Sequence, residues 1–333
     1  GAELIDWKNK YPRKQVGPHK VRSVGCAIAM QGSGIPFSDM GSCAITLQDG
    51  GFYMVRCGAT DIGQGSDTLI SQIVAEELMT TVDKIIIYSS DTDLAPFDVG
   101  AYASSTTYIS GNAAWKTAIK MRERLISEAA TMLGVKESTV EFDGKKFVSG
   151  NKEISLYDLS NKLIYSAPQH QVAVTESYIG HVSPPPFMAA YAEIELDTET
   201  GEYEVLEYVS VVDCGTTINP MLAKGQVEGG IVQGFGMAAK EDVFYNNKGQ
   251  LLSNSFLYYH IPTTKDIKKL TTEFADSYEP TGPFGAKSVG EIGIDTPPAV
   301  ICNAVYNAVG VRINTLPITP EKILKAMKEK AAK

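Results

Sequence analysis

Apolar and polar residues alternate along this chain with two different periods, and each period predicts its own kind of element. Strand-like segments flank short turns at Gln48-Asp-Gly-Gly51 and Thr198-Glu-Thr-Gly201, and each turn therefore predicts a β-hairpin. A helical stripe of apolar residues runs through 66–79, with Ser66 and Asp67 at its start. The predicted strands span 42–47, 52–57, 84–88, 187–197 and 205–213, and a long helix is predicted over 109–133.

Start and stop residues predict three more helices. Asn219-Pro220 supplies an N-cap and a first helical residue for a helix to about Lys240. Thr296-Pro297 opens a helix that stops at Gly310, and a short helix follows Pro320. Residues 89–107 lack periodicity, and a loop of that length inside a compact domain is usually functional.

Strands and helices alternate irregularly and include hairpins, so the predicted fold class is α+β in two lobes rather than a doubly wound sheet. The second lobe is expected to begin near Ser166, which gives lobes of residues 1–165 and 166–333. The first forty residues show a mixed pattern, in which Pro12, Pro18 and residues 32–36 indicate loop.

Composition excludes several classes of protein. The 333 residues are 44% hydrophobic and 21% charged with a net charge of −9, values of a folded globular chain rather than a disordered or fibrous one. An acidic balance disfavours sequence-independent nucleic-acid binding. No apolar run reaches the roughly 18 residues of a membrane helix, and the first residues are not those of a signal peptide.

The metal-ligating residue types show no metal-ligand spacing. Five scattered cysteines contain no C-x-x-C, which argues against a disulfide framework, a zinc ribbon and an iron–sulfur ligand run. Reduced core thiols in a cytoplasmic protein are the expected alternative. The four histidines (His19, His170, His181, His260) are expected to be structural or on the surface. Walker, G-x-S-x-G and G-x-G-x-x-G signatures opening a βαβ unit are absent.

Three glycine-rich segments, each expected to lead into a helix, are the candidate chemistry. They are residues 58–65, residues 225–236 and residues 282–293. Glycine lets a phosphate or carboxylate approach the N–H groups of a helix N-terminus, and Gln64, Gln226 and Gln233 add amides that can bind the edge of a heterocycle. Ordinary turn glycines are the alternative, and for any single segment they are the favoured one.

Glu291 is the candidate general base. It lies between Gly290 and Gly293 in a neighbourhood that is apolar apart from Lys287. A carboxylate on a tight apolar loop is expected to be desolvated, which favours a general base near neutral pH. A surface glutamate is the alternative, although Val289 and Ile292 make full solvation less favourable.

Taken together in order, these segments resemble the molybdenum hydroxylases of the xanthine oxidase and aldehyde oxidoreductase family. The similar residues extend from about 20 to 325, and the set as a whole is specific although each segment is weak alone. The segments are 58–65, 72–77, 91–96, 110–113, Val212-Asp-Cys-Gly215, Ile218-Asn-Pro220, Gly225-Gln226, Ile261-Pro262, Gly285-Ala-Lys287, Val289-Gly-Glu291 and Leu316-Pro-Ile-Thr-Pro-Glu321.

The resemblance covers the C-terminal half of the family's molybdopterin-binding subunit and implies a cofactor and partners. The cofactor is a molybdenum–molybdopterin cytosine dinucleotide with a terminal sulfur or selenium, held through the pterin and by no metal-ligating side chain. The implied partners are a large molybdopterin subunit, an iron–sulfur subunit with 2Fe–2S clusters and an FAD subunit, in an obligate hetero-oligomer with no nucleic acid or membrane. An interface above about 2,000 Å² is expected.

Carried over residue by residue, Glu291 matches the family's catalytic base. The implied cofactor-binding residues are Gly63, Gln64, Gly65, Ala101, Tyr102, Ala103, Ser104, Ser105, Thr106 and Gln226. Two departures matter: many relatives have Arg where Ser105 stands, and Ile292 replaces a common Pro. Tyr102 stands where relatives often carry small residues, so it is expected either to contact a flat substrate or to pack against the partner.

The implied reaction is hydroxylation of an electron-poor heterocyclic carbon with water, Glu291 taking up the proton. Electrons then pass through iron–sulfur clusters and flavin to NAD(P). A split molybdenum module is similar to that of the bacterial nicotinate dehydrogenases, so nicotinate, giving 6-hydroxynicotinate, is the first substrate expected. A split purine or xanthine dehydrogenase or an aldehyde oxidoreductase is the alternative, and a non-catalytic scaffold or cofactor-loading protein is the rival of a different class.

Overall fold

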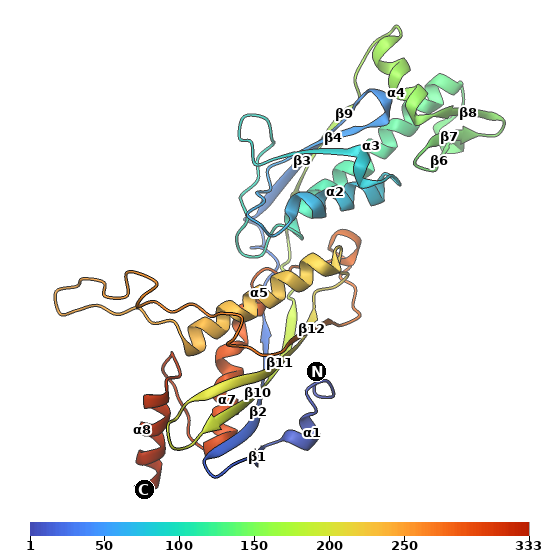
Figure 1. Cartoon of the computed structure of the whole chain (residues 1–333). Coiled ribbons are helices and arrows are strands. Elements are labelled where there is room, and N and C mark those ends of the chain that lie inside the picture. Colours follow the sequence, from blue (N-terminus) through green and yellow to red (C-terminus); the bar gives the residue numbers. More distant parts are fainter. Residues whose placement is uncertain (333) are drawn as a thin grey trace.

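Each predicted hairpin becomes the centre of its own sheet, and the two sheets define two lobes (Figure 1). The computed structural model describes residues 1–332. The hairpin turns lie where the glycines predict them, and both confirm the expected strand pairs. The architecture is α+β, as predicted.

The first lobe is a four-stranded sheet in the order β5-β4-β3-β9, with β5 parallel to β4 and the other pairs antiparallel. Helix α3 packs on β3 and β9, and α2 packs against α3. A three-stranded sheet with α4 extends the lobe at its far end (Figure 1). The bounds are β3 (Met40–Leu47), β4 (Tyr53–Cys57), β5 (Ile85–Ser89), β6 (Glu141–Phe142), β7 (Lys146–Ser149), β8 (Lys152–Ser155), β9 (Ala173–Ile179), α2 (Ser66–Glu77), α3 (Ile109–Leu133), α4 (Leu156–Tyr165) and the 3₁₀ turns Asp49–Gly51, Val82–Lys84 and Glu137–Thr139.

The second lobe is a five-stranded sheet in the order β1-β2-β10-β11-β12, antiparallel except for β12 beside β11. Helix α7 packs on β2 and β10, and α5 packs on α6 and α7. The bounds are α1 (Trp7–Lys10), β1 (Arg13–Gln15), β2 (Lys20–Met30), β10 (Phe187–Asp197), β11 (Tyr203–Asp213), α5 (Pro220–Ala239), β12 (Leu270–Phe274), the 3₁₀ turn Pro283–Gly285, α6 (Ile292–Asp295), α7 (Pro297–Val309) and α8 (Pro320–Ala331).

The predicted lobe boundary at residues 165/166 is wrong, because it assigns segments on each side of it to the wrong lobe. Strand β2 pairs with β10 over eleven residues, so the first thirty residues belong to the second lobe. Strand β9 pairs with β3, so 173–179 belong to the first lobe. The chain therefore passes between the lobes twice, and a single cut in the sequence cannot separate them.

Strand β2 is also the largest element that the hydrophobic pattern missed. Its middle carries Ser23 and Gly25, which interrupt an apolar alternation although both are buried against α7. The Ser23 hydroxyl donates to the carbonyl of Ala304 at 2.8 Å, and Gly25 leaves room for the backbone of the same helix. The close packing of α7 thus requires Ser23 and Gly25, two residue types that do not predict a strand.

The second glycine-rich segment does not lead into a helix, contrary to expectation. Residues 225–236 lie inside α5. A Cβ at Gly230 would stand 3.0 Å from the Cα of Gly293, and one at Gly234 would stand 2.5 Å from the carbonyl oxygen of Ile294. These glycines let α5 approach α6, so their role is packing. Within residues 1–332 no helix is both long and apolar enough to cross a membrane.

Candidate functional site

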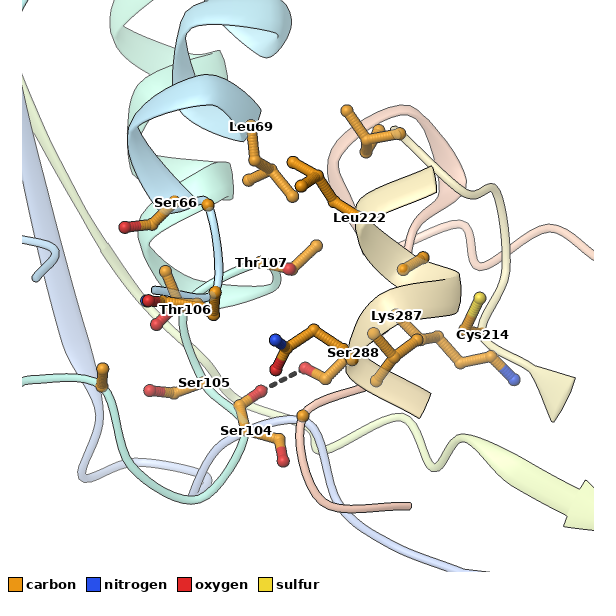
Figure 2. A pocket seen from close by; sticks show the side chains of 18 of the residues that line it. Ser66, Leu69, Ser104, Ser105, Thr106, Thr107, Cys214, Leu222, Lys287 and Ser288 are labelled. Atoms are coloured by element: carbon orange, nitrogen blue, oxygen red, sulfur yellow. Dashed lines mark hydrogen bonds between the residues drawn. The ribbon is translucent and has the colours of Figure 1, made fainter. Parts of the chain in front are cut away.

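The two lobes repeat one arrangement, and the cavity lies where the two copies meet. In each lobe the second hairpin strand leads by a loop into a helix, which returns to a parallel edge strand: β4–α2–β5 and β11–α5–β12. The beginnings of α2 and α5 face each other, with Leu69 and Leu222 pointing toward one another (Figure 2). An amide–amide hydrogen bond of 3.1 Å from Asn219 to Gln72 joins the two helices.

The cavity between these helices has a volume of about 360 Å³. Its other walls are the loop 101–107 and the loop 287–291. Every predicted site residue except Gly63 lines it; the lining is Ile62, Gln64, Gly65, Ser66, Leu69, residues 101–107, Cys214, residues 216–219, Leu222, Ala223, Gln226 and residues 287–291. The tertiary structure thus brings the three sequence segments together.

Glu291 is exposed in this chain, so the expectation of a desolvated carboxylate on an apolar loop is wrong for the described residues. Its neighbour Ile292 is buried and anchors the loop. The carboxylate is held by two donors that both reach Oε2: Ser104 Oγ at 2.8 Å and Gln31 Nε2 at 2.6 Å. Gln31 was not singled out by sequence reasoning, because it follows β2, where no element was expected.

An ion pair between a buried lysine and a half-buried aspartate fixes the loop that carries Glu291. Lys287 Nζ lies 2.8 Å from Asp213 Oδ1 and donates to the carbonyl of Pro185 at 3.1 Å, and its side chain is only 9% exposed. Although burial raises the pKa of Asp213, its bonds from Lys287, Ser277 and the N–H of Gly215 bring it below its ordinary value. The Val212–Gly215 and Gly285–Lys287 segments are therefore structural partners.

The Gly63–Gly65 loop uses its N–H groups internally. Asp61 accepts from the N–H groups of Gly63 at 2.9 Å, Gly65 at 3.3 Å and Asp67 at 3.2 Å. Burial raises the pKa of Asp61, but these three donors together hold it below its ordinary value. The Gln64 amide braces the same loop, accepting from the N–H of Ile62 at 2.6 Å and donating to the carbonyl of Thr60 at 2.8 Å. A phosphate at this helix start would compete with a carboxylate already in place.

Other polar groups of the cavity are not engaged. The hydroxyl of Ser66 is buried, lines the cavity and has no hydrogen-bond partner among the described residues. A buried hydroxyl without a partner costs free energy unless a ligand or water satisfies it. The side chains of Gln226, Thr107 and Thr217 make no side-chain hydrogen bond within residues 1–332. These donors and acceptors fit a polar, hydrogen-bonding cofactor.

The loop 101–107 has an unusual backbone at the cavity wall. Ala103 and Ser104 both have positive φ, 50° and 52°, a region that costs a non-glycine residue energy. The carbonyl of Ala103 accepts from the N–H of Gly34 at 2.9 Å, and that of Ser104 accepts from the Ser288 hydroxyl. Ser105 is buried and donates to the carbonyl of Gly100 at 3.2 Å, so its hydroxyl braces the loop.

Tyr102 is 45% exposed, and its hydroxyl donates to Asp39 Oδ1 at 2.8 Å. That bond, followed by burial, raises the pKa of Tyr102. Asp39 is fully buried and also accepts from the N–H of Ile35 at 2.8 Å. The hydroxyl is thus occupied within the chain, and only the ring face is free for another molecule.

No group of three or more histidine, cysteine or acidic side chains within residues 1–332 is arranged to hold a metal ion. The five cysteines are all free, and three of them are buried. Burial raises the pKa of the Cys214 thiol at the cavity wall to about 12.

Comparisons with known proteins show what the whole chain is similar to. Residues 1–268 match the family model of the molybdopterin cofactor-binding domain. The chain is 36% identical over 99% of its length to a protein of Escherichia coli K12 described as a probable hypoxanthine oxidase. It is 33% identical over 97% of its length to subunit gamma of the 6-hydroxypseudooxynicotine dehydrogenase complex of Paenarthrobacter nicotinovorans.

Solved structures show the same fold. A crystal structure of a Cu,Mo-containing CO dehydrogenase superposes with a TM-score of 0.86 at 26% identity, covering 99% of this chain and 43% of the other. Quinoline 2-oxidoreductase from Pseudomonas putida 86 gives 0.86 at 26% identity, covering 93% of this chain and 42% of the other. The chain spans only 34% and 41% of the lengths of the two relatives from Escherichia coli and Paenarthrobacter.

Proposed function

The chain belongs to the molybdopterin cofactor-binding domain family within the xanthine oxidase-type molybdenum hydroxylases, and from this premise we propose that it forms one wall of a hydroxylase active site in which Glu291 is the general base. The single observation that carries the proposal is that distant segments of the sequence meet at one cavity. Glu291, Gln226 and the loop 101–107, far apart in sequence, line one cavity between the lobes. A non-catalytic scaffold or cofactor-loading protein has no need of a fixed carboxylate there.

The proposed cofactor is a molybdenum–molybdopterin cytosine dinucleotide, which supplies the two-electron oxidation chemistry when bound. On this chain the unengaged Gln226 amide, the Ser66 hydroxyl and the threonines of the cavity would hold it. The Gln64 amide and the Gly65 N–H already make hydrogen bonds within the loop, so they would offer the cofactor only the hydrogen-bonding sites that remain. Gly63, which was predicted to contact the cofactor, does not line the cavity and would not touch it.

The role of Glu291 follows from its geometry. With Oε2 bonded to Ser104 and Gln31, the second oxygen, Oε1, is the atom left to accept a proton. A carboxylate fixed in one orientation can take a proton from the hydroxylating water species as the substrate carbon is attacked. The other atoms of the reaction lie outside this chain.

The substrate proposed is an electron-poor N-heterocycle, with nicotinate first. Two relatives are described by N-heterocyclic substrates, hypoxanthine and a nicotine derivative, which supports the class without choosing within it. The Tyr102 ring, 45% exposed beside the cavity, would offer such a ring a flat apolar face. Purine and aldehyde oxidation are the alternatives that a substrate panel separates.

Further protein is proposed to complete the site: a large molybdopterin portion, with iron–sulfur and FAD subunits that pass electrons to NAD(P). The relatives' greater length supports this. A cytoplasmic location stays a prediction.

Glu291→Gln in the purified intact enzyme tests the proposed role. Loss of a positioned base costs about 10²–10⁴ in rate, while molybdenum content should stay at the wild-type level. Glu329→Gln, an exposed glutamate without hydrogen-bond or ion-pair partners within residues 1–332, is the matched control and should keep full activity. An active Glu291→Gln enzyme would remove Glu291 from the mechanism, and a preparation without molybdenum and pterin would end the proposal.

The substrate panel is run on the same enzyme with nicotinate, hypoxanthine, xanthine and an aromatic aldehyde. The expected order has nicotinate turning over fastest. Purines faster by about tenfold, a difference of 1.4 kcal/mol in transition-state binding, would assign a purine hydroxylase instead.

A further inference from the structure

Gln31 contacts Glu291 from the end of β2, 260 positions earlier in the sequence. The contact is short, 2.6 Å from Nε2 to Oε2, and the other amide atom, Oε1, is buried with no hydrogen-bond partner among the described residues. A buried acceptor left unsatisfied is unfavourable. Leaving Oε1 without a partner costs free energy. The hydrogen bond from Nε2 to the Glu291 carboxylate is the contact that explains this orientation of the amide.

The loop around Gln31 is rigidly attached to the loop of Glu291. Ser33 Oγ donates to the carbonyl of Pro184 at 2.7 Å and accepts from the N–H of Ser288 at 3.1 Å. The N–H of Gln31 donates to the carbonyl of Pro186 at 3.2 Å. The Ser33 hydroxyl thus joins the loop of Gln31 to the backbone of the loop that carries Glu291, and the bonds to Pro184 and Pro186 fix the loop of Gln31 from its other side.

The loop of Ser104 is joined to both of the others. The N–H of Gly34 donates to the carbonyl of Ala103 at 2.9 Å, and the Ser288 hydroxyl donates to the carbonyl of Ser104. A Cβ at Gly290 would stand 3.0 Å from Ser104 Oγ, so a glycine at 290 is what leaves room for this hydroxyl. Three loops, 31–34, 103–104 and 287–291, thus form one bonded bracket with the Glu291 carboxylate at its centre.

We propose that Gln31 is a positioning residue that, together with Ser104, holds Oε2 of Glu291 and leaves Oε1 as the single reactive oxygen. This inference rests on the proposed function of Glu291. Two donors on one oxygen stabilise the charged carboxylate and fix its rotation about the last side-chain bond. Without them both oxygens exchange positions, and the productive orientation is populated only part of the time.

The kinetic test uses Gln31→Met in the intact enzyme, a variant that keeps the length of the side chain and removes its donor. We expect kcat to fall about 10- to 100-fold with KM changed by less than about twofold, because orientation and not substrate binding is lost. Gln31→Lys restores an N–H donor within reach and should recover part of the rate. Gln169→Met, an exposed glutamine of the first lobe, is the matched control.

A second measurement does not depend on turnover. Carbodiimide labelling of Glu291, followed by peptide mass spectrometry of the purified enzyme without substrate, reports how freely the carboxylate reacts. Release of one charge-assisted hydrogen bond should speed labelling about tenfold in Gln31→Met and in Ser104→Ala. Labelling of the exposed Glu199 should stay constant.

The outcomes are distinguishable. An unchanged labelling rate together with an unchanged kcat in Gln31→Met would overturn the positioning role while leaving the proposed base in place. Equal losses in Gln31→Met and Gln31→Lys with loss of molybdenum would also overturn it, since shape alone would then matter. Failure of the proposed function itself appears elsewhere, as an active Glu291→Gln enzyme.

Discussion

At the scale of single residues, side chains of this site bond first to the protein itself. Asp61 takes three N–H groups at the start of α2, and Tyr102 bonds to the buried Asp39. Glycines and glutamines near a helix start suggested free donors for a phosphate, but a nearby carboxylate satisfies the same groups. The donors that remain free, such as the Ser66 hydroxyl, carry no motif that the sequence could reveal.

Asp61→Ala should destabilise the chain by about 1 kcal/mol at pH 7, the cost of removing an acceptor from a helix start. Because the folded-state pKa of Asp61 is lowered, the stabilisation it gives is present above about pH 4 and is lost as the pH falls through the folded-state value. Urea unfolding of both proteins from pH 7 to pH 3 measures it. Asp61→Asn, which keeps one acceptor, should lie between them; a difference that grows in acid would contradict the assignment.

Lys287→Met should cost about 3 kcal/mol, because it leaves the Asp213 carboxylate without its cation in a half-buried position. The folded-state pKa of Asp213 is lowered in the wild type, so this difference is present above about pH 4 and is lost as the pH falls through that lowered value. Chemical unfolding monitored by fluorescence is the measurement. Lys224→Met, which removes a surface partner 3.8 Å from Glu228, should change stability by less than about 0.5 kcal/mol. Equal effects at the two lysines would show that the Asp213 pair does not anchor the loop.

At the scale of elements, the predictions that depend on a few neighbouring residues, such as helix caps and hairpin turns, were accurate. Asn219 caps α5 by accepting from the N–H of Leu222 at 3.1 Å, and Gly310 ends α7 with φ of 71°. The hairpins, α3 and α7 also lie where predicted. By contrast β2 and β9 were missed, because their partner strands β10 and β3 lie far away in the sequence. The strands β6–β8 pair with one another locally but are too short to show a clear pattern.

Two glycines of α5 test the packing role assigned to them. Gly225 has open space where a Cβ would lie, so Gly225→Ala should stabilise the chain by about 0.5–1 kcal/mol through helix propensity. Gly234→Ala should destabilise it by about 1–3 kcal/mol, because the new methyl group would clash with Ile294 and Pro297. Thermal unfolding of the pair in the same helix separates the two effects. Equal shifts would mean that α5 is not tightly packed at Gly234.

At the scale of the whole molecule, the chain passes twice between two lobes, and the cavity is lined by both. A ligand in such a cavity is bound only when both lobes are folded and in place. Occupancy should therefore couple their unfolding, since binding to the native state alone stabilises it by mass action.

Removal of the molybdenum cofactor from the intact enzyme should accordingly lower its melting temperature by several degrees and broaden the transition. Differential scanning calorimetry of the loaded and stripped enzyme is the measurement, with Glu291→Gln as the control that loses activity but keeps the shift. Identical melting curves would mean that the cofactor does not bind between the lobes. A stabilisation of about 4 kcal/mol corresponds to a ligand concentration near 1,000 times Kd.

The sequence by itself determined the hairpins and the helix ends. Those features depend on backbone preferences and residue types within a few positions, which the chain carries locally. Only the tertiary structure decided which lobe β2 and β9 join and that Gln31 reaches Glu291. These are pairings of polar groups across up to 260 positions, and each exists because another part of the fold buries or anchors its partner.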